Sequence, residues 1–332
     1  MKDCIAAAVI LLSLLFGLPW LTAEKGAAEK ETETPPSEET ARLDEQVTLT
    51  VWDGETVREM TVAEYLPGVV RGEMPATFGA EALKAQAVTA RTYLYYKVTT
   101  GSKPNHPEAA VCMFPDCCAA YTAADKAAEK WGDKAEEYEA KIQQAVQATD
   151  GQVLLYGGEP ILAAFHSSSD GVTANSGDVW VKDLPYLVSV SSPENGDSVP
   201  NYYSVKTVSA EEFQKTFTAA HAEAVFGEDP AQWIREVKHN DSGRVETLCV
   251  GGVTVEGTQM RSLYGLRSAS FTAECTAQEV TFRVTGYGHG VGMSQYGANI
   301  LAGEGKTWQE ILHWYYTDVT IGPYAPKDYT NG

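Results

Sequence analysis

Residues 65–96 read YLPGVVRGEMPATFGAEALKAQAVTARTYLYY and predict two helices joined by a short turn. A T-x-x-E capping box at residues 61–64 precedes a run of apolar residues at helical spacing, so the first helix should begin near Val62. Pro75 disfavours helical geometry in the residue before it, which ends this helix near Glu73. Glu73 is therefore expected at a helix end, beside a turn.

The second predicted helix runs from Ala80 to about Val98 and is rich in Ala, Leu, Lys and Gln. An apolar stripe along it predicts a buried face, formed by Leu83, Ala87, Ala90 and Leu94. Lys84 and Arg91 lie roughly two turns apart on one face. From spacing alone they are either surface residues or a basic pair that meets a carboxylate or an acidic sugar substituent, and Glu73 is either solvated or functional.

The composition excludes several classes of partner. The chain has 332 residues, 44% of them hydrophobic, which is enough for one large domain or two smaller ones. Its formal net charge of -20 and its lack of a basic run argue against nucleic acid and against a charged patch for anionic lipid. A neutral or weakly charged partner such as a glycan is compatible with this charge.

The N-terminal region predicts a membrane segment followed by a linker. Residues 1–22 include an almost wholly apolar stretch and predict an uncleaved signal anchor, with a cleaved signal peptide as the alternative. Residues 23–46 are acidic and poor in apolar side chains, which predicts a disordered linker. Residues 47–325 should form the folded domain, with residues 195–275 as a smaller accessory lobe.

The folded domain mixes helix and strand signals, which predicts an α+β fold around one elongated groove. VTLTV at residues 47–51, followed by a DG turn and VREMTV, reads as a hairpin. LPYLVSVSS at residues 184–192 reads as a further strand. Capping motifs at Ser209 and Thr307 start two later helices.

Residues 166–180, HSSSDGVTANSGDVW, gather hydrogen-bonding groups of the kind that a sugar site requires. His166, Ser167 and Ser168 begin this loop. A serine-hydrolase site is a rival hypothesis, but the G-x-S-x-G elbow is missing and no acid partner is placed. A packed or surface His166 is the other alternative.

Residues 286–298, GYGHGVGMSQYGA, are dense in glycine, which lets the backbone pass close to a ligand or another segment. This segment should line the groove. His289 could donate to a sugar hydroxyl, orient Glu73, or be fixed structurally between glycines. Tyr287 and Tyr296 offer rings on which sugar faces could stack.

Residues 105–121, NHPEAAVCMFPDCCAAY, place His106, Cys112 and Cys118 at intervals of six, with Cys117 alongside. Histidine and cysteine in one short loop suit zinc, although the spacing matches no common zinc finger. A loop disulfide or free thiols are the alternatives, and adjacent Cys117 and Cys118 would rarely bridge to each other without strain.

VVRGEMPATFGAEALKAQAVTARTY and the distant GYGHGVGMSQYGA resemble the stage II sporulation protein D (SpoIID/LytB-type) family of cell-wall proteins of spore-forming bacteria. The resemblance covers roughly residues 47–321. It implies a membrane-anchored lytic transglycosylase that cleaves bonds between N-acetylmuramic acid (MurNAc) and N-acetylglucosamine (GlcNAc) in peptidoglycan and leaves 1,6-anhydro-MurNAc ends. Glu73, in the EMP motif, would be the catalytic acid and base.

This chemistry needs a single carboxyl group that starts protonated. Met74 and Phe78, as apolar neighbours, would raise the pKa of Glu73 by desolvation, whereas Lys84 and Arg91 would lower it if they were close.

The resemblance also implies a set of ligand-binding residues. Substrate contacts are expected from Lys84, Gln86, Arg91, His166, Ser167, Ser168, Tyr287, His289, Ser294, Gln295 and Tyr296. Some members of the family carry zinc in the cysteine loop, and His106, Cys112 and Cys118 would be its ligands, with Cys117 or water as the fourth. The zinc would be structural, since catalysis requires no metal. The family has Gly where this chain has Asp170, which alters the expected turn.

The implied setting is the mother-cell membrane during engulfment, with a single-pass anchor and an extracytoplasmic catalytic domain. Expected partners are peptide-stripped glycan strands, a sporulation amidase/endopeptidase and membrane scaffold proteins, with no nucleic acid. The alternative is a non-catalytic wall-binding protein that enhances an amidase, as related LytB-type proteins do.

Overall fold

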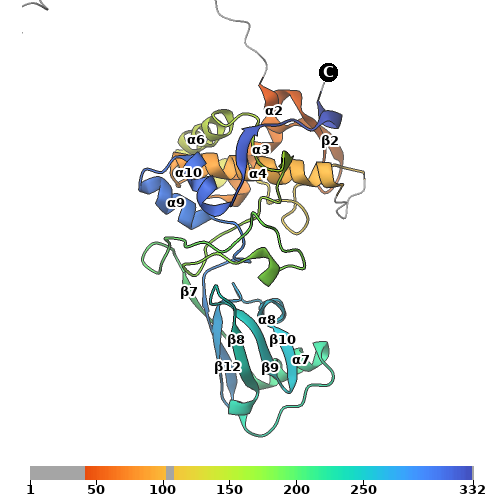
Figure 1. Cartoon of the computed structure of the whole chain (residues 1–332), viewed down its shortest axis with the longest axis vertical. Helices are drawn as coiled ribbons and strands as arrows, with labels where there is room; N and C mark the ends of the chain where they lie inside the picture. The colour runs from red at the N-terminus through yellow and green to blue at the C-terminus, as the bar shows by residue number, and fades with distance from the viewer. Residues whose placement is uncertain (1–41, 102–107, 331–332) are drawn as a thin grey trace, which may run out of the picture. The chain divides into compact units, whose positions relative to one another are not determined.

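The computed structural model describes residues 42–101 and 108–330 and has the predicted mixture of helices and strands (Figure 1). The helices of the described residues are α2 (Leu43–Gln46), α3 (Val62–Glu73), α4 (Ala80–Thr100), α5 (Ala124–Trp131), α6 (Ala135–Gln147), α7 (Ala210–Ala220), α8 (Gly257–Tyr264), α9 (Gln295–Gly303) and α10 (Trp308–Tyr315). The fold class α+β is therefore confirmed.

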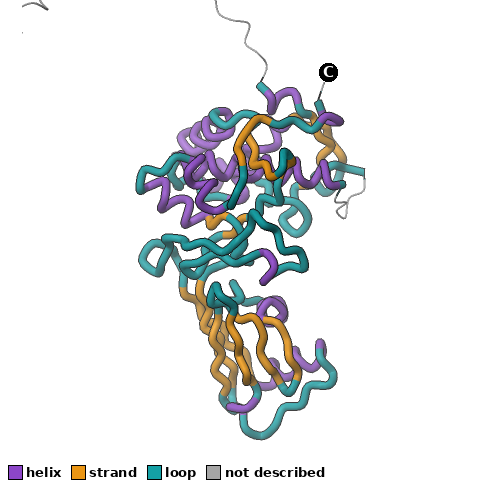
Figure 2. The backbone as a smooth tube through the Cα atoms, viewed as in Figure 1, coloured by secondary structure: helices purple, strands orange, loops and turns teal. Residues whose placement is uncertain are grey.

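The strands form several small sheets, drawn in orange in Figure 2. Sheet order and bounds are β2-β1-β3 (Val57–Thr61, Thr48–Trp52, Val111–Cys112), β14-β4-β5 (Thr320–Pro323, Gln152–Tyr156, Glu159–Pro160), β13-β6 (Met293–Ser294, Phe165–His166), β11-β12-β7 (Phe271–Cys275, Glu279–Thr285, Tyr203–Ser209) and β10-β9-β8 (Val253–Glu256, Val245–Val250, Ile234–His239). β1 and β2 form the predicted antiparallel hairpin. β13 pairs with β6 in parallel, which brings the glycine-rich segment beside the His166 loop.

Helix α4 is the element on which α3, α6, α9, α10 and β4 pack. The predicted apolar stripe is buried, and so are residues on its other faces, such as Ala85 and Val88. Because many of these side chains are small, neighbouring helices can approach α4 from several directions.

Helix α3 begins and ends where the sequence predicts. The hydroxyl of Thr61 accepts the backbone N–H of Glu64, and the Glu64 carboxylate accepts the N–H of Thr61, which completes the capping box. Met74 is already extended, in the position before Pro75, so Glu73 is the last helical residue.

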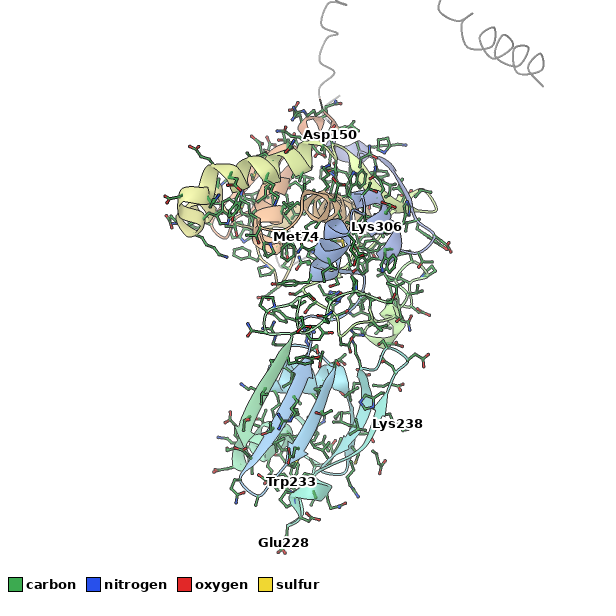
Figure 3. The ribbon with its side chains drawn as sticks, turned by 90° about the vertical axis from the view of Figure 1, so that its left-hand side faces the viewer. Met74, Asp150, Glu228, Trp233, Lys238 and Lys306 are labelled. Atoms are coloured by element: carbon green, nitrogen blue, oxygen red, sulfur yellow. The ribbon has the colours of Figure 1, made fainter. Side chains whose placement is uncertain are left out.

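A second hydrophobic cluster lies among α7, α8 and the strands β7 to β12. The ring of Phe213 stacks on those of Phe217 and Trp233 within it. The first hydrophobic cluster is the one formed around α4, and Figure 3 labels Met74 in that cluster and Trp233 in the second. Phe282 and Val284 also belong to it, so the cluster reaches beyond residue 275, where the sequence analysis ended the accessory lobe.

The last residues of the predicted linker are folded, which corrects the expected boundary. Asp44 of α2 is buried and accepts two hydrogen bonds from Arg91, at 2.8 Å from Nε and 2.6 Å from Nη2. Asp150 accepts the backbone N–H groups of Leu43 and Asp44, which fixes α2 in place. The Arg91 side chain has no exposed surface, so the prediction that it binds substrate is wrong.

Residues 184–192 do not form the predicted strand. Their polar groups bond instead to the loop at Thr173, whose N–H donates to the carbonyl of Val190 and whose carbonyl accepts the hydroxyl of Ser189. Side-chain hydroxyls here replace the ladder of a regular sheet.

No helix of the described residues combines the length and the apolar composition that a membrane crossing requires. The predicted anchor at residues 1–22 and the linker up to residue 41 lie outside the described residues.

Replacing Asp44 by Asn should lower the free energy of unfolding by about 3–5 kcal/mol, because the guanidinium of Arg91 would remain buried without its counter-charge. Urea denaturation measures this loss. The matched control is Arg58→Met, which breaks an ion pair whose arginine side chain is 63% exposed and should leave the midpoint nearly unchanged. Equal effects of the two variants would contradict the role given to the buried pair.

Candidate active site

Glu73 and His289, far apart in the sequence, line the same pocket of about 280 Å³. Its walls are formed by Glu73, Tyr93, Pro115, Cys118, Leu162, Ala163, Ala164, Phe165, Trp180 and His289. Glu73 is the one carboxylate among these residues. The pocket therefore presents a single acidic group within largely apolar and aromatic walls.

The Glu73 carboxyl is half-buried, and one of its oxygens accepts the backbone N–H of Ala120 at 2.6 Å. Burial raises the pKa of this carboxyl, and the hydrogen bond from Ala120 opposes the rise only in part. Lys84 pairs with Glu81 at 2.7 Å, and neither Lys84 nor the buried Arg91 lines the pocket. The predicted apolar residues Met74 and Phe78 are both buried beside the end of α3.

Gln295 contacts the backbone of Glu73, and Gln86 contacts Gln295. The side-chain amide of Gln295 donates to the Glu73 carbonyl at 2.8 Å and lies 3.3 Å from the oxygen of Gln86. Both glutamines are buried, so these contacts fix the end of α3 against α4 and α9 instead of reaching a ligand. The substrate contacts expected of them are not what the structure shows.

His289 forms part of the pocket wall, and one of its ring nitrogens bonds to the backbone. Its Nδ1 accepts the N–H of Val291 at 3.0 Å. The ring lies 5.2 Å from that of Trp180. Burial lowers the pKa of His289 to about 4, so the ring is neutral at neutral pH. The bond between Nδ1 and the Val291 N–H agrees with a histidine fixed between glycines.

The His166 loop is pinned to the glycine-rich segment. Ser168 and Tyr287 exchange backbone hydrogen bonds, and the Ser167 carbonyl accepts the N–H of Tyr296. His166 is buried, with Nδ1 at 3.2 Å from the Val291 carbonyl and no partner for Nε2 among the described residues. Burial holds the pKa of His166 well below its usual value. His166 and the buried hydroxyl of Ser168 therefore lie beneath the surface, which contradicts direct contact with a ligand.

A buried carboxylate that was not predicted, Glu194, ties this loop to the start of α9. It accepts the N–H of Ser169 at 2.7 Å, the hydroxyl of Ser294 at 2.6 Å and the hydroxyl of Ser192. The Ser294 hydroxyl also accepts the N–H of Gly297 and so caps α9. Ser294 is thus a structural residue, not the substrate contact that we predicted.

Asp170, the departure from the family pattern, has a partner in this chain. It pairs with the buried Arg244 at 2.7 Å, and Arg244 also donates to the Val172 carbonyl. A Cβ at Gly290 would lie 2.7 Å from the Arg244 side chain, which explains the glycine there.

The two tyrosines predicted to stack on sugars differ in exposure. Tyr296 meets Phe78 edge to face, with ring centroids 5.0 Å apart, and is half-buried. Tyr287 is 45% exposed, and the Arg267 guanidinium lies 4.0 Å from its ring centroid. One face of Tyr287 is therefore covered by a cation.

The sulfur atoms of Cys112, Cys117 and Cys118 lie within 4.8 Å of one another, and Cys118 lines the pocket. Tetrahedral zinc holds thiolates at about 2.3 Å, so three sulfurs this close fit one ion. The sulfurs of Cys117 and Cys118 are 3.9 Å apart, beyond bonding distance. His106 lies outside the described residues.

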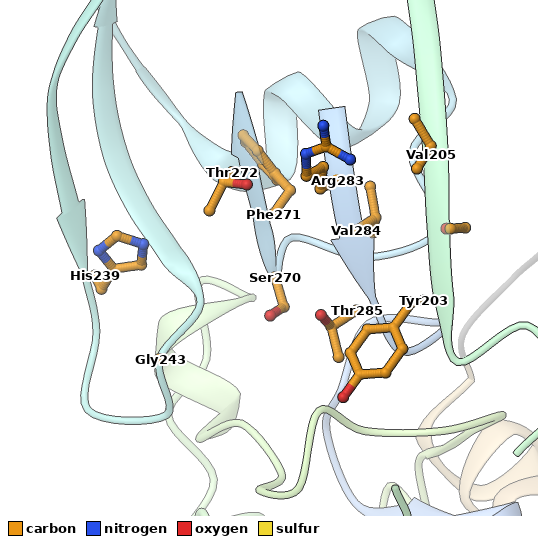
Figure 4. A pocket seen from close by; sticks show the side chains of 11 residues that line it. Tyr203, Val205, His239, Gly243, Ser270, Phe271, Thr272, Arg283, Val284 and Thr285 are labelled. Atoms are coloured by element: carbon orange, nitrogen blue, oxygen red, sulfur yellow. The ribbon is translucent and has the colours of Figure 1, made fainter. Parts of the chain in front are cut away.

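A second hollow, of about 410 Å³, lies on the sheet β11-β12-β7 (Figure 4). Tyr203, Arg283 and His239 are among its lining residues, and none of these lining residues carries a carboxylate. This hollow therefore lacks the acidic group that glycoside cleavage requires.

Comparison with known proteins decides the family. A family profile described as "Stage II sporulation protein" (SpoIID) matches residues 53–156, which include Glu73 and the cysteine loop. The stage II sporulation protein D of Bacillus subtilis (strain 168) is 34% identical over 331 residues, which cover 96% of this chain and 93% of the relative. The chain belongs to the SpoIID family.

Two further relatives of this SpoIID-family chain differ in how much of their length it covers. The stage II sporulation protein D of Bacillus amyloliquefaciens is 34% identical over 94% of this chain and 92% of its own length. The protein named amidase enhancer from Bacillus subtilis (strain 168) is 27% identical over 78% of this chain and 40% of its own length. The family resemblance drawn from the sequence is confirmed.

Trp180 and Tyr93 line the pocket of this SpoIID-family chain but were not predicted. Trp180 ends the polar loop HSSSDGVTANSGDVW, where a large aromatic among hydrogen-bonding groups is a usable signal for a sugar site. Tyr93 gave no signal, because it lies among the aromatic residues of α4.

Replacing Glu73 by Gln should stabilise the protein at neutral pH. The raised pKa means that ionising Glu73 costs folding free energy, a cost that is absent below the unfolded pKa and complete above the folded one. The amide stays neutral, so Glu73→Gln should exceed the parent in unfolding free energy at pH 7 and lose this gain towards about pH 4. Urea denaturation at both pH values tests this, and a variant less stable than the parent at pH 7 would contradict it.

Proposed function

We propose that this chain is a peptidoglycan lytic transglycosylase that cleaves MurNAc–GlcNAc bonds and leaves 1,6-anhydro-MurNAc ends. The observation that carries the proposal is the pocket with one carboxyl group, Glu73, whose pKa burial raises. Hydrolytic glycosidases generally need two carboxylates, one for the acid and one for the nucleophile or base. Membership of the SpoIID family supports the same conclusion.

In the proposed reaction the single carboxyl group of Glu73 first donates one proton and later accepts another. Glu73 begins protonated and donates to the glycosidic oxygen as the bond to C1 of MurNAc breaks. The carboxylate then accepts the proton of the C6 hydroxyl of the same sugar as that oxygen bonds to C1. Glu73 ends protonated, and no water is consumed.

The neighbours of Glu73 serve these two stages differently. Apolar walls raise the pKa of the carboxyl and so favour its protonated form at the start, whereas the Ala120 N–H bonds to the carboxylate that forms midway. Gln295 holds the backbone of Glu73, and neutral His289 adds no charge that would lower its pKa. Trp180 and Tyr93 provide aromatic surface for sugar rings, and the pocket would form part of an elongated groove.

The cysteine cluster is proposed to hold a structural zinc ion through Cys112, Cys117 and Cys118, with His106 as the fourth ligand. When bound, zinc would cross-link this loop. The loop leads directly to Ala120, whose N–H bonds to Glu73, so the metal would act on the site by fixing that donor.

The proposed setting follows from family membership. Residues 1–22 would anchor the protein in the mother-cell membrane, residues 23–41 would form a linker, and the remaining chain would act outside the cytoplasm during engulfment. Its substrate would be glycan strands that a partner amidase/endopeptidase has stripped of peptides, and membrane scaffold proteins would place it there.

The alternative function is a wall-binding protein without catalysis that enhances an amidase. The similarity to the protein named amidase enhancer favours it. In that case Glu73 would be dispensable for the effect of the protein on its partner.

Glu73→Gln should reduce the release of anhydro-muramyl products from peptide-stripped glycan by about 1000-fold or more, because both proton transfers depend on this group. Mass spectrometry of the products measures this. Glu81→Gln, which changes a carboxyl paired with Lys84 outside the pocket, is the matched control and should stay active. If the parent and Glu73→Gln both bind the strands but leave them uncut, the result would favour the enhancer hypothesis over the transglycosylase.

Cys112→Ser or Cys118→Ser should lower the zinc content and the melting temperature, because either change removes a thiolate ligand. Elemental analysis and thermal melting measure the two quantities. Cys275→Ser, in the second hydrophobic cluster, is the control and should retain the metal. A parent protein that holds no zinc after purification without chelator would exclude the site.

A further inference from the structure

Arg261 and Arg267 lack the carboxylate partner that other enclosed arginines have. The described arginines that are buried or half-buried are Arg71, Arg91, Arg244, Arg261 and Arg267. The first three form ion pairs, with Glu139, Asp44 and Asp170. For Arg261 and Arg267 the described residues provide neither an ion pair nor a side-chain hydrogen bond, and Arg267 Nε is enclosed without a partner.

This lack of partners is costly in a chain with so many carboxylates. A guanidinium partly removed from water is unfavourable without a counter-charge or acceptor. The chain has 45 acidic residues against 25 basic ones, so a carboxylate partner would be easy to supply. Two such groups in one place therefore point to an anion from outside the chain.

Both arginines belong to a segment that is bound to the glycine-rich segment of the active site. Arg261 is on α8, and its carbonyl accepts the N–H of Leu266 just after that helix ends. The carbonyl of Arg267 accepts the N–H of Gly288 at 2.9 Å, and its guanidinium stacks on Tyr287 at 4.0 Å. Arg261 is close enough to His289 for its charge to help lower the pKa of that ring, which burial lowers most, and Tyr287 is among the groups that influence the pKa of Arg261.

This position is next to the Glu73 pocket. His289 lines that pocket, and Tyr287 is two residues away, within about 7 Å along the backbone. Tyr287 is 45% exposed, so the stacked pair faces solvent. A ligand group beside the reacting sugar can therefore meet the arginines.

We propose that Arg261, Arg267 and Tyr287 form an anion subsite for the free lactyl carboxylate of a MurNAc residue that has lost its peptide. The inference rests on the proposed function and assigns the residues that select the substrate. In a strand with peptides the lactyl group is an uncharged amide, and removal of the peptide leaves a carboxylate. Arginine binds carboxylates through paired N–H groups, and stacking on Tyr287 fixes the plane of one guanidinium.

The subsite also addresses the net charge of the chain. A protein with a formal charge of -20 repels a glycan that carries a negative charge on its muramic acids. Two partnerless guanidinium groups beside the pocket would reverse the local sign of the field where the carboxylate binds. A buried arginine such as Arg244, neutralised by Asp170, would not.

The test measures binding by the full chain in detergent, in the Glu73→Gln background so that no strand is cut. One probe is an oligosaccharide from peptide-stripped glycan with free lactyl carboxylates, and the other is the same oligosaccharide with each carboxylate converted to its methylamide. The chain with both arginines should bind the free acid about tenfold or more tightly than the methylamide.

Arg261→Gln combined with Arg267→Gln should abolish this preference and leave the affinity for the methylamide unchanged. The matched control is Arg283→Gln, an exposed arginine on the sheet β11-β12-β7, which should keep the preference. Arg267→Lys should retain part of it, since it keeps the charge and loses the planar fork.

Three results would overturn the subsite: no preference in the chain with both arginines, a preference that survives in the double variant, or equal weakening of both probes. Failure of the proposed function gives a different pattern. A chain with intact Glu73 that binds the free acid with this preference but makes no anhydro ends would keep the subsite and reject the transglycosylase.

Discussion

The burial of α4 on several sides sets the geometry of the rest of the first hydrophobic cluster. Small side chains let α3, α9 and other elements pack directly against this helix. Its one fully buried arginine is neutralised by Asp44, which brings α2 into the core. Since α3 ends in Glu73 and α9 begins with Gln295, packing on a shared helix brings the acid and the group that holds its backbone together.

Local signals in the sequence predicted local structure well. The capping boxes at Thr61 and Thr307, the apolar stripe of α4 and the first hairpin depend on neighbours a few residues away, and all are present. Glu73 and His289 were predicted through family motifs, and they line one pocket. The strand predicted at residues 184–192 failed because side-chain hydroxyls formed bonds that a sheet would have supplied.

Long-range partners explain most of the wrong assignments. Arg91 finds its carboxylate 47 residues away, in a segment that composition marked as linker. Ser294 bonds to Glu194 across 100 residues, and no periodicity or motif connects the two. A motif residue therefore proved to be a poor guide to ligand contact when its polar atoms were already used inside the fold.

The electrostatics of the site favour a carboxyl that can change its protonation state. His166 and His289 are both held neutral by burial, and Arg244 is paired with Asp170, so these three groups add no uncompensated positive charge that would keep Glu73 ionised. The same burial makes the ionised carboxylate unfavourable in the folded protein. The ionised form of Glu73, the residue that the proposed chemistry needs, therefore lowers the free energy of unfolding.

The central claim is that the C6 hydroxyl of the substrate, not water, attacks C1 when Glu73 acts. The most direct measurement is to run the reaction in water enriched in oxygen-18 and to weigh the new glycan ends by mass spectrometry. The single-carboxyl account predicts ends that contain no oxygen-18. One oxygen-18 atom in each new end would show that water is the nucleophile and would contradict it.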